Sequence, residues 1–262
     1  MDSATSRYVQ VYHDSKHELP GLEVPWVART RNQAIDTFDK TGFPTKRNED
    51  WKYTPVTPVE TCIFRLPNTT VGTSTLFENE QNVHGLGCYS IAFLDGQLVG
   101  TIDPQTVPKG VQISSISTAL SENYLSAHTH LTKHANINSN GFCALNTAMM
   151  HTGAVIQITA NTTVDRPIML TFISSGQMEN VATYPRILVT AGTNTEVQII
   201  ERYVGLGSER YFTNHVSEIV LEENARMEHY KIQEETQSSF HVSTMQIHQD
   251  RDSHFVSHSI SL

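Results

Sequence analysis

The second half of the chain repeats one short pattern, and this repeat restricts the possible folds more than any other feature of the sequence. Pairs of apolar residues two positions apart recur at separations of 31, 32 and 26 residues: Ile156/Ile158, Ile187/Val189, Ile219/Leu221 and Met245/Ile247. Residues two apart on a β-strand face the same side, so each pair suits a strand with one buried face. Turn-forming residues follow the pairs, at 161–163, 192–194, 222–224 and 249–252.

A second β-like stretch follows each of the first three turns, at 168–173, 197–204 and 227–232. Two strands per repeat at a nearly constant period are typical of the stacked coils of a β-solenoid. An antiparallel sandwich is the alternative, although its turns would recur roughly every 8–12 residues. The repeat therefore predicts a mainly β fold and favours a solenoid.

The N-terminal part of the chain has a different character, with helical periodicity and polar residues. Pro25 suits the first position of a helix that extends through Phe38, and Gly42 suits its C-cap. Trp51 and Tyr53 follow in a charged stretch. Their spacing predicts a short extended strand that inserts both rings into one surface. A connection anchored by the tryptophan alone is the simpler alternative.

Between these parts, residues 61–88 carry many turn formers and few apolar residues, as a linker does. We therefore expect an N-terminal helical region with its linker at 1–85 and the β core at 86–262. Within the core, two apolar runs around Asp95-Gly96 predict a β-hairpin over 89–99. Apolar periodicity predicts one helix over 116–131 and a short one over 142–149.

Charge and composition exclude several classes of protein. The chain has 18 basic and 27 acidic residues, a net charge of −9, which argues against nucleic acid or an anionic membrane as the main partner. No apolar run approaches the roughly 20 residues of a membrane span, and the first 16 residues lack the apolar core of a secretory signal. Three scattered cysteines, Cys62, Cys88 and Cys143, suit a reducing compartment. These features predict a cytoplasmic protein.

Two groups of histidines are the candidates for metal binding. The first, at the end of the chain, comprises His241, His248, His254 and His258, together with Asp250 and Asp252. Imidazole and carboxylate suit iron or zinc, but the favoured interpretation places these histidines on the solvated outside of the solenoid.

The second group, His128, His130 and His134, is interpreted as a polar helix face, because it lacks the glutamate of a zinc protease motif. Cys62 and Cys143 lie among apolar neighbours and are interpreted as core residues. We therefore predict no catalytic, cofactor-binding or metal-binding residue in this chain.

Several motifs, in order along the chain, resemble the SufB/SufD family of the Suf iron–sulfur cluster assembly system. They are Gly42-Phe43-Pro44, Asn48-Glu49-Asp50-Trp51-Lys52-Tyr53-Thr54, Phe142-Cys143-Ala144-Leu145-Asn146 and the strand and turn from Glu218 to Ala225. The segment around Trp51 is more similar to SufD than to SufB. The resemblance runs from about residue 25 to the last residue, and it implies a right-handed parallel β-helix preceded by a small helical region.

The resemblance also implies a function and partners. The chain is expected to be a non-enzymatic scaffold that assembles with SufB and the ATPase SufC, with an iron–sulfur cluster held transiently by the complex and no cofactor bound by this chain alone. Members of the family continue with further coils and a helical segment that contacts SufC, so that contact segment is expected to be absent from this chain. Residues 254–262 alternate like a strand without a cap, so self-association through this C-terminal edge is expected. The alternative function is a β-helix hydrolase or lyase acting on polysaccharide, for which only Asp250 and Asp252 approach the required cluster of carboxylates.

Overall fold

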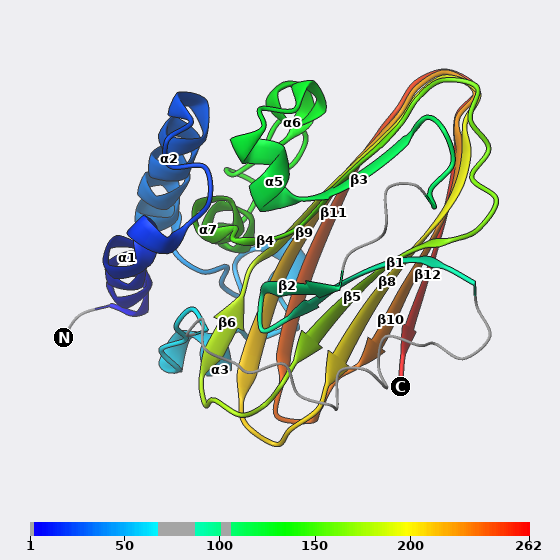
Figure 1. The fold of residues 1–262 in the computed structure, drawn as a ribbon. Helices are drawn as coiled ribbons and strands as arrows, with labels where there is room; N and C mark the ends of the chain where they lie inside the picture. Colours follow the sequence, from blue (N-terminus) through cyan, green and yellow to red (C-terminus); the bar gives the residue numbers. More distant parts are fainter. Residues whose placement is uncertain (1–2, 68–86, 101–105) are drawn as a thin grey trace.

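The computed structural model describes residues 3–67, 87–100 and 106–262 (Figure 1). The helices are α1 (Ala4–Ser15), η1 (Lys16–Glu18), α2 (Pro25–Thr41), η2 (Glu49–Trp51), α3 (Thr57–Thr61), α5 (Ile116–Ser121), α6 (Leu125–His130) and α7 (Gly141–Met149). The strands are β1 (Tyr89–Leu94), β2 (Gln97–Gly100), β3 (Val111–Ser115), β4 (Thr152–Ile158), β5 (Ile168–Ser174), β6 (Val181–Thr183), β7 (Pro185–Ala191), β8 (Glu196–Gly205), β9 (Tyr211–Leu221), β10 (Arg226–Glu234), β11 (Phe240–Gln249) and β12 (His254–Ser261).

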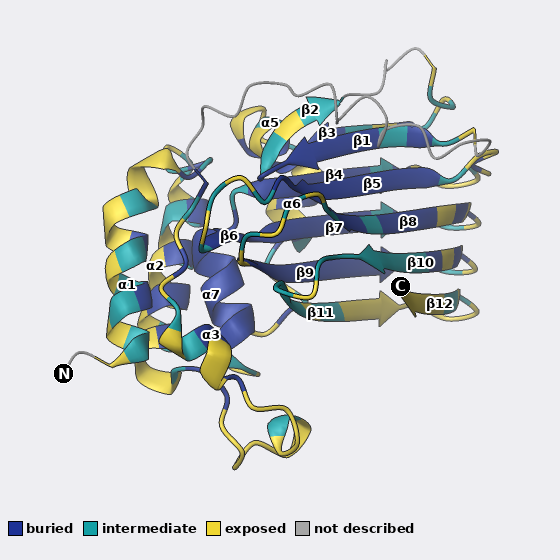
Figure 2. Cartoon of the chain, turned by 90° about the horizontal axis from the view of Figure 1, so that it is seen from below, coloured by how far each residue is buried: buried dark blue, intermediate teal, exposed yellow. Residues whose placement is uncertain are grey.

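From β4 onward the chain winds as a parallel β-solenoid, as the repeat predicted. Successive strands alternate between two sheets, whose orders are β12-β10-β8-β5-β1-β2 and β11-β9-β7-β4-β3. The two sheets face each other, and successive coils stack in parallel layers (Figures 1 and 2). At the first coil, β3 pairs antiparallel with β4, whereas β1 pairs in parallel with β5 and antiparallel with β2. The hairpin turns at Asp95 and Gly96, which both have positive φ, as Asp-Gly predicted.

The apolar repeat forms ladders inside the solenoid. Ile156 pairs in register with Val189, Val189 with Ile219, and Ile219 with Ile247. Ile156, Val189 and Ile219 belong to the main buried cluster between the sheets. Burying such a side chain contributes roughly 1.5–3 kcal/mol relative to leaving it exposed. The period-two pattern therefore fixes which face of each strand points inward.

A ladder of asparagines lies at the turns between the sheets. Asn161, Asn194 and Asn224 occupy the same position of successive coils with φ near +60°, a conformation that asparagine tolerates. The side-chain amide of Asn194 donates to Asn161 at 3.0 Å, and that of Asn224 donates to Asn194 at 2.8 Å. These are turns that the sequence predicted, and the ladder links them from coil to coil.

Helices cover the outer face of the sheet that contains β4, β7 and β9 (Figure 1). Helix α7 packs between α2 and β9, and its residues are buried along its whole length. The Arg31 guanidinium on α2 is fully buried and donates to the carbonyls of Ala148 and Met150, each at 2.7 Å. A buried arginine bound to carbonyls at the end of α7 fastens the N-terminal helices to the segment that leads into β4.

A buried ion pair joins this helical layer to the solenoid. Arg186 on β7 and Glu218 on β9 point outward from the sheet, and their Nη2 and Oε2 atoms are 2.6 Å apart with both side chains fully buried. Arg186 also donates to Asn146 and Thr147 of α7, each at 3.1 Å. At Gly153 on β4, an added Cβ would lie 1.9 Å from the carbonyl oxygen of Arg186, so only glycine allows this close approach.

Two details of the expected helical part are wrong. The single helix expected over 116–131 is two helices, because Asn123 adopts a positive φ between α5 and α6. The segment around Trp51 is a turn of 3-10 helix, so residues two apart do not share a face. Trp51 packs on Phe142 with ring centroids 5.1 Å apart, whereas Tyr53 is 86% exposed. The tryptophan alone anchors this segment.

Candidate functional site: a charged cluster inside the solenoid

The interior of the solenoid changes from apolar to charged along its axis. One inward ladder runs in register through Ile91, Leu170, Glu201, Lys231 and Ser259, on β1, β5, β8, β10 and β12. Its first two members belong to the apolar core, and the next two are a carboxylate and an ammonium group. Charged groups are rarely enclosed unless they are paired, so this change identifies the most unusual chemistry of the described chain.

Glu201 is the centre of the charged cluster, and its side chain is only 1% exposed. Ser217 donates its hydroxyl to Oε1 at 2.8 Å, and Tyr203 donates to Oε2 at 3.0 Å. The imidazole nitrogens nearest to the carboxylate are His229 Nε2, 3.2 Å from Oε1, and His215 Nδ1, 3.6 Å from Oε2. Four strand positions on three strands thus converge on one buried carboxylate.

The hydrogen bonds place a proton on one ring nitrogen of His215. The one proton of the Ser217 hydroxyl goes to Glu201, so the contact of 2.9 Å between Ser217 Oγ and His215 Nε2 requires the ring to donate. His215 Nδ1 lies 3.3 Å from the Ser243 hydroxyl oxygen. His215 is thus held by one serine on its own strand and another on β11.

Burial and neighbouring charges act in opposite directions on these groups. Burial lowers the pKa of His215 to about 3, although the Glu201 carboxylate opposes this shift. For Glu201 itself, burial raises the pKa, but His215, His229 and the Ser217 hydroxyl outweigh burial, and the net pKa is lowered. The cluster therefore holds Glu201 as an ionised carboxylate at pH 7.

A second carboxylate and an ammonium group extend the cluster toward β11. Glu235 Oε2 lies 2.7 Å from His241 Nδ1, and both side chains are only 6% exposed. Lys231 faces the interior beside Glu201, and burial lowers its pKa while Glu201 and Glu235 oppose this shift. The His241 ring packs edge-on against Tyr203 at 4.6 Å. Lys231 supplies the positive charge that compensates the buried carboxylates.

Glutamate, histidine and serine are also the residue types of a hydrolytic triad, but their arrangement differs from one. A triad serine donates to the imidazole that acts as its base. Here Ser217 donates to Glu201 and accepts from His215. The three side chains are almost fully buried between the two sheets. A substrate could reach the Ser217 oxygen only if the coils separated, so the geometry favours a structural polar cluster over a nucleophile.

The structure corrects one expectation about the histidines and bears out others. His241 points into the solenoid, where it contacts Glu235. Its expected place on the solvated outside is therefore wrong. His248, His254 and His258 are exposed on the outside, as expected. Asp250 and Asp252 lie at the exposed turn between β11 and β12, with His248 Nε2 3.4 Å from Asp250.

The other expected positions are mostly confirmed. Cys143 is buried in the core, and Cys62 is half-buried with the Arg210 guanidinium 3.2 Å from its sulfur. His134, however, lies beyond the end of α6 and not on the expected helix face. Within the described ranges, no group of three or more histidine, cysteine or carboxylate side chains surrounds a possible metal position.

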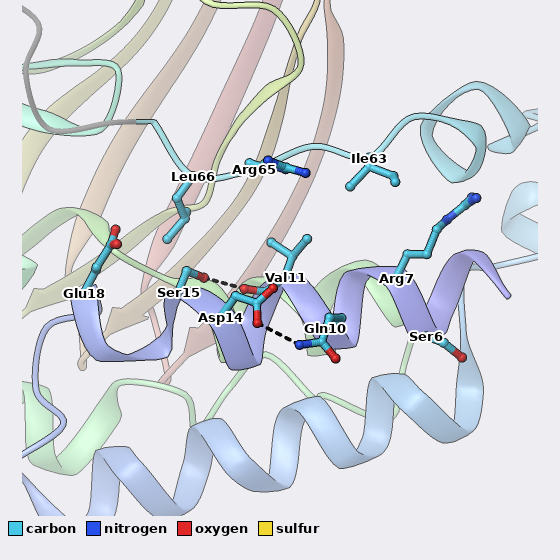
Figure 3. A pocket seen from close by; sticks show the side chains of 10 residues that line it. All are labelled: Ser6, Arg7, Gln10, Val11, Asp14, Ser15, Glu18, Ile63, Arg65 and Leu66. Atoms are coloured by element: carbon cyan, nitrogen blue, oxygen red, sulfur yellow. Dashed lines mark hydrogen bonds between the residues drawn. The ribbon is translucent and has the colours of Figure 1, made fainter. Parts of the chain in front are cut away.

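A separate pocket of about 630 Å³ lies on the surface between α1 and residues 63–66 (Figure 3). Charged groups of both signs line it, including Arg7, Asp14 and Arg65. The Asp14 carboxylate accepts from Gln10 at 2.7 Å within the helix, and Arg7 donates to the carbonyl of Glu60 at 2.9 Å. Arg7 and Asp14 are thus engaged locally, and the interior cluster is the stronger candidate for a function.

A parallel β-solenoid with a helical layer on one sheet defines the structural class of the protein. Two family descriptions match the chain in succession: SufBD protein N-terminal region over residues 2–170, and SUF system FeS cluster assembly, SufBD core domain, over residues 172–262. The chain therefore belongs to the SufB/SufD family of iron–sulfur cluster assembly proteins. This confirms the family that the sequence motifs indicated.

Three curated relatives show the same relationship. The chain is 28% identical over 254 residues to the iron–sulfur cluster assembly SufBD family protein slr0076 of Synechocystis, covering 90% of this chain and 54% of that protein. It is 25% identical to the chloroplastic protein ABCI7 of Arabidopsis thaliana, covering 92% and 51%, and 24% identical to the iron–sulfur cluster assembly protein SufD of Escherichia coli, covering 88% and 52%. The chain thus spans about half the length of these relatives.

Among the helices that the structure describes, none is both long and apolar enough to cross a membrane.

Proposed function

We propose that this chain is a non-catalytic scaffold subunit that assembles with SufB, and through SufB with the ATPase SufC, in the formation of iron–sulfur clusters. The observation that carries this proposal is the succession of the two SufB/SufD family matches, which together cover residues 2–170 and 172–262. The SufD of Escherichia coli, a named iron–sulfur cluster assembly protein, aligns with 88% of the chain. In this proposal the cluster forms in the complex, and the chain has no resident cofactor of its own.

The architecture supports a scaffold more than a substrate-binding enzyme. Stacked coils fix the positions of the surface residues, and the buried Arg186–Glu218 pair holds the helical layer on the solenoid. The charged groups inside the solenoid bind one another and lie away from solvent, as Glu201 does.

Co-expression tests the proposed assembly directly. The chain, carrying an affinity tag, is expressed with SufB and SufC and purified without oxygen, and iron and sulfide are measured in the eluate. We expect SufB to co-purify, SufC to appear only when SufB is present, and iron and sulfide to follow the complex. The chain alone should hydrolyse neither ATP nor pectin.

Two results would contradict the proposal. One is the absence of SufB from the purified material, although the chain is folded by circular dichroism. The other is cleavage of polysaccharide by the chain alone, which would support the alternative of a β-helix hydrolase or lyase. Replacing Asp250 with Asn then tests whether the exposed carboxylates at the end of β11 carry that activity.

A further inference from the structure

The surface pocket beside α1 is a groove of about 630 Å³ with an apolar stripe along its floor (Figure 3). Val11 of α1 and Leu66 of the extended segment opposite are half-buried and pack on the N-terminal core. Ile63 is 40% exposed, whereas its neighbour Phe64 is fully buried. The groove thus leaves an apolar surface in contact with solvent that a ligand could cover.

The two ends of the stripe carry opposite charges. Arg7 of α1 lies at one end and Glu18 of η1 at the other (Figure 3). Glu18 follows Arg7 by 11 residues, which corresponds to about 17 Å along a helix. The positive end of the α1 dipole lies on the side of Arg7. One end of the groove therefore attracts an anionic group, and the other end attracts a cationic group.

Two further charges lie on opposite walls of the groove, Arg65 on the extended segment and Asp14 on α1 (Figure 3). Asp14 accepts from the uncharged side-chain amide of Gln10, and Arg7 donates to the uncharged backbone carbonyl of Glu60, so neither charge is neutralised. The Arg65 side chain has no hydrogen-bond or ion-pair partner among the described residues. An arginine and a carboxylate on facing walls suit the carbonyl and N–H groups of a peptide backbone.

Both walls of the groove are fixed by the core. The backbone N–H of Arg65 donates to the carbonyl of Asn180 at 3.0 Å, and its carbonyl accepts from Ala182 at 2.8 Å. On the other wall, Tyr8 of α1 is buried and donates its hydroxyl to the carbonyl of Val59 at 2.9 Å. Because the groove is already formed, little has to be ordered when a ligand binds, and this favours affinity.

A short extended peptide matches these features in length and charge. The first, third and fifth side chains of such a peptide face the same side and span about 13 Å. With an acidic first residue and a basic fifth residue, the two flexible side chains can reach Arg7 and Glu18, and an apolar third residue lies on the stripe. The volume of the groove also lies within the range of about 300–1,000 Å³ that is usual for ligand pockets.

We propose that the groove between α1 and residues 63–66 binds an extended segment of a partner protein that carries an acidic, an apolar and a basic residue at alternate positions. The apolar residue covers Ile63 and Val11, and the charged residues pair with Arg7 and Glu18. This surface goes beyond the proposed scaffold function and does not depend on it, so either proposal can fail alone.

Titration of the 262-residue chain with three synthetic peptides tests the proposal. The matching peptide is acetyl-Asp-Thr-Leu-Thr-Lys-amide, and the other two carry Asp at both ends or Lys at both ends. We expect the matching peptide to bind most tightly to the unsubstituted chain. E18K makes both ends of the groove basic, so it should weaken the matching peptide by at least about threefold and favour the peptide with two Asp residues.

Two further variants separate the groove from the rest of the surface. E23K makes the same change of charge at an exposed residue outside the groove, so it should leave the order of the three peptides unchanged. I63D should weaken all three by on the order of tenfold, because it removes the exposed part of the apolar stripe. Equal affinities for the three peptides, or the same effect of E18K and E23K, would overturn the proposal.

Chemical shift changes in the unsubstituted chain give a test that does not depend on any variant. The matching peptide should move the backbone amide signals of Val11, Ile63 and Leu66 in a saturable manner below about 1 mM. Changes confined to other residues, or no binding at that concentration, would contradict the assignment. Changes at these three residues that follow protein concentration without any peptide would show that a second copy occupies the groove, and the proposal would then be wrong.

Discussion

Replacing Glu218 with Gln is expected to cause a large loss of stability, because this carboxylate is both a buried charge and a buried acceptor. Glu218 Oε2 lies 2.6 Å from Arg186 Nη2, and both side chains are fully buried. Its two oxygens also accept three backbone N–H groups from residues 132–135. Glutamine has nearly the same shape, so the substitution removes the charge and one acceptor without creating a cavity.

The expected magnitude follows from two costs that overlap. Breaking a buried ion pair by removing one partner costs about 3–5 kcal/mol, since the other charge stays buried without compensation. Each buried N–H group left without an acceptor costs roughly 1–3 kcal/mol. Because both costs arise in one network and are not additive, we expect the free energy of unfolding to fall by about 4 kcal/mol. For a chain of this size, this corresponds to a decrease in Tm of about 10 °C.

Thermal and urea unfolding followed by circular dichroism measure this change. Replacing Glu223 with Gln is the matched control, because Glu223 contacts Arg251 on the exposed surface. Its removal should change Tm little, as is usual for exposed pairs. The double variant R186M/E218Q should recover part of the lost stability, because it leaves no uncompensated charge. An unchanged Tm of the Glu218 variant would refute the reasoning.

Three further outcomes are expected. Replacing Trp51 with Ala should lower the free energy of unfolding by ~2 kcal/mol, less than the ~3–5 kcal/mol of a fully buried ring, and replacing the exposed Tyr53 with Ala should leave urea unfolding unchanged. Burial raises the pKa of Glu218, but Arg186 and the backbone donors outweigh burial, so the net pKa is lowered. Glu218 therefore stabilises the fold above its ordinary pKa of 4.5 and loses this contribution as the pH falls below that value. The difference in Tm between the original chain and the variant with Gln at position 218 should accordingly shrink in acid. A polypeptide of residues 1–262 prepared alone should self-associate through β11 and β12. Light scattering should show less association after Ile260 on β12 is replaced with Asp. The same replacement of Leu98, which is similarly exposed on β2, should leave the association unchanged.

The fold could be predicted from the sequence to the extent that local pattern decides it. The pairs such as Ile187/Val189 have the spacing of a strand with one buried face, and the turns at Asn194 and Asn224 have residues that tolerate a positive φ. Both patterns extend over only a few residues, so they can be recognised in the sequence without knowledge of the tertiary structure. The prediction of one helix over 116–131 was wrong because it also relied on local pattern alone. The apolar periodicity continues through Asn123, but the backbone there adopts a positive φ that ends the helix.

The interior cluster could not be predicted, because it depends on register between coils. Glu201 and Lys231 become neighbours only when β8 and β10 pair with that alignment, and the repeat lengths of the chain are not constant. A charged residue at an inward position of a strand is the one signal that the sequence offers. At Glu201, two positions after Ile199, that signal was present, but its partners His215 and His229 lie on other coils.

Strand β9 connects the two unusual features of the molecule through adjacent residues. Ser217 points inward and donates to Glu201, while Glu218 points outward and holds Arg186 and the loop of His134. Because side chains alternate along a strand, a register slip of one residue would move Glu218 into the interior and Ser217 to the helical face. Both polar networks would then lose their partners at once. The two networks therefore specify the same register of β9, which is also the register that the apolar ladders favour. They do so at the coil where the interior of the solenoid changes from apolar to charged.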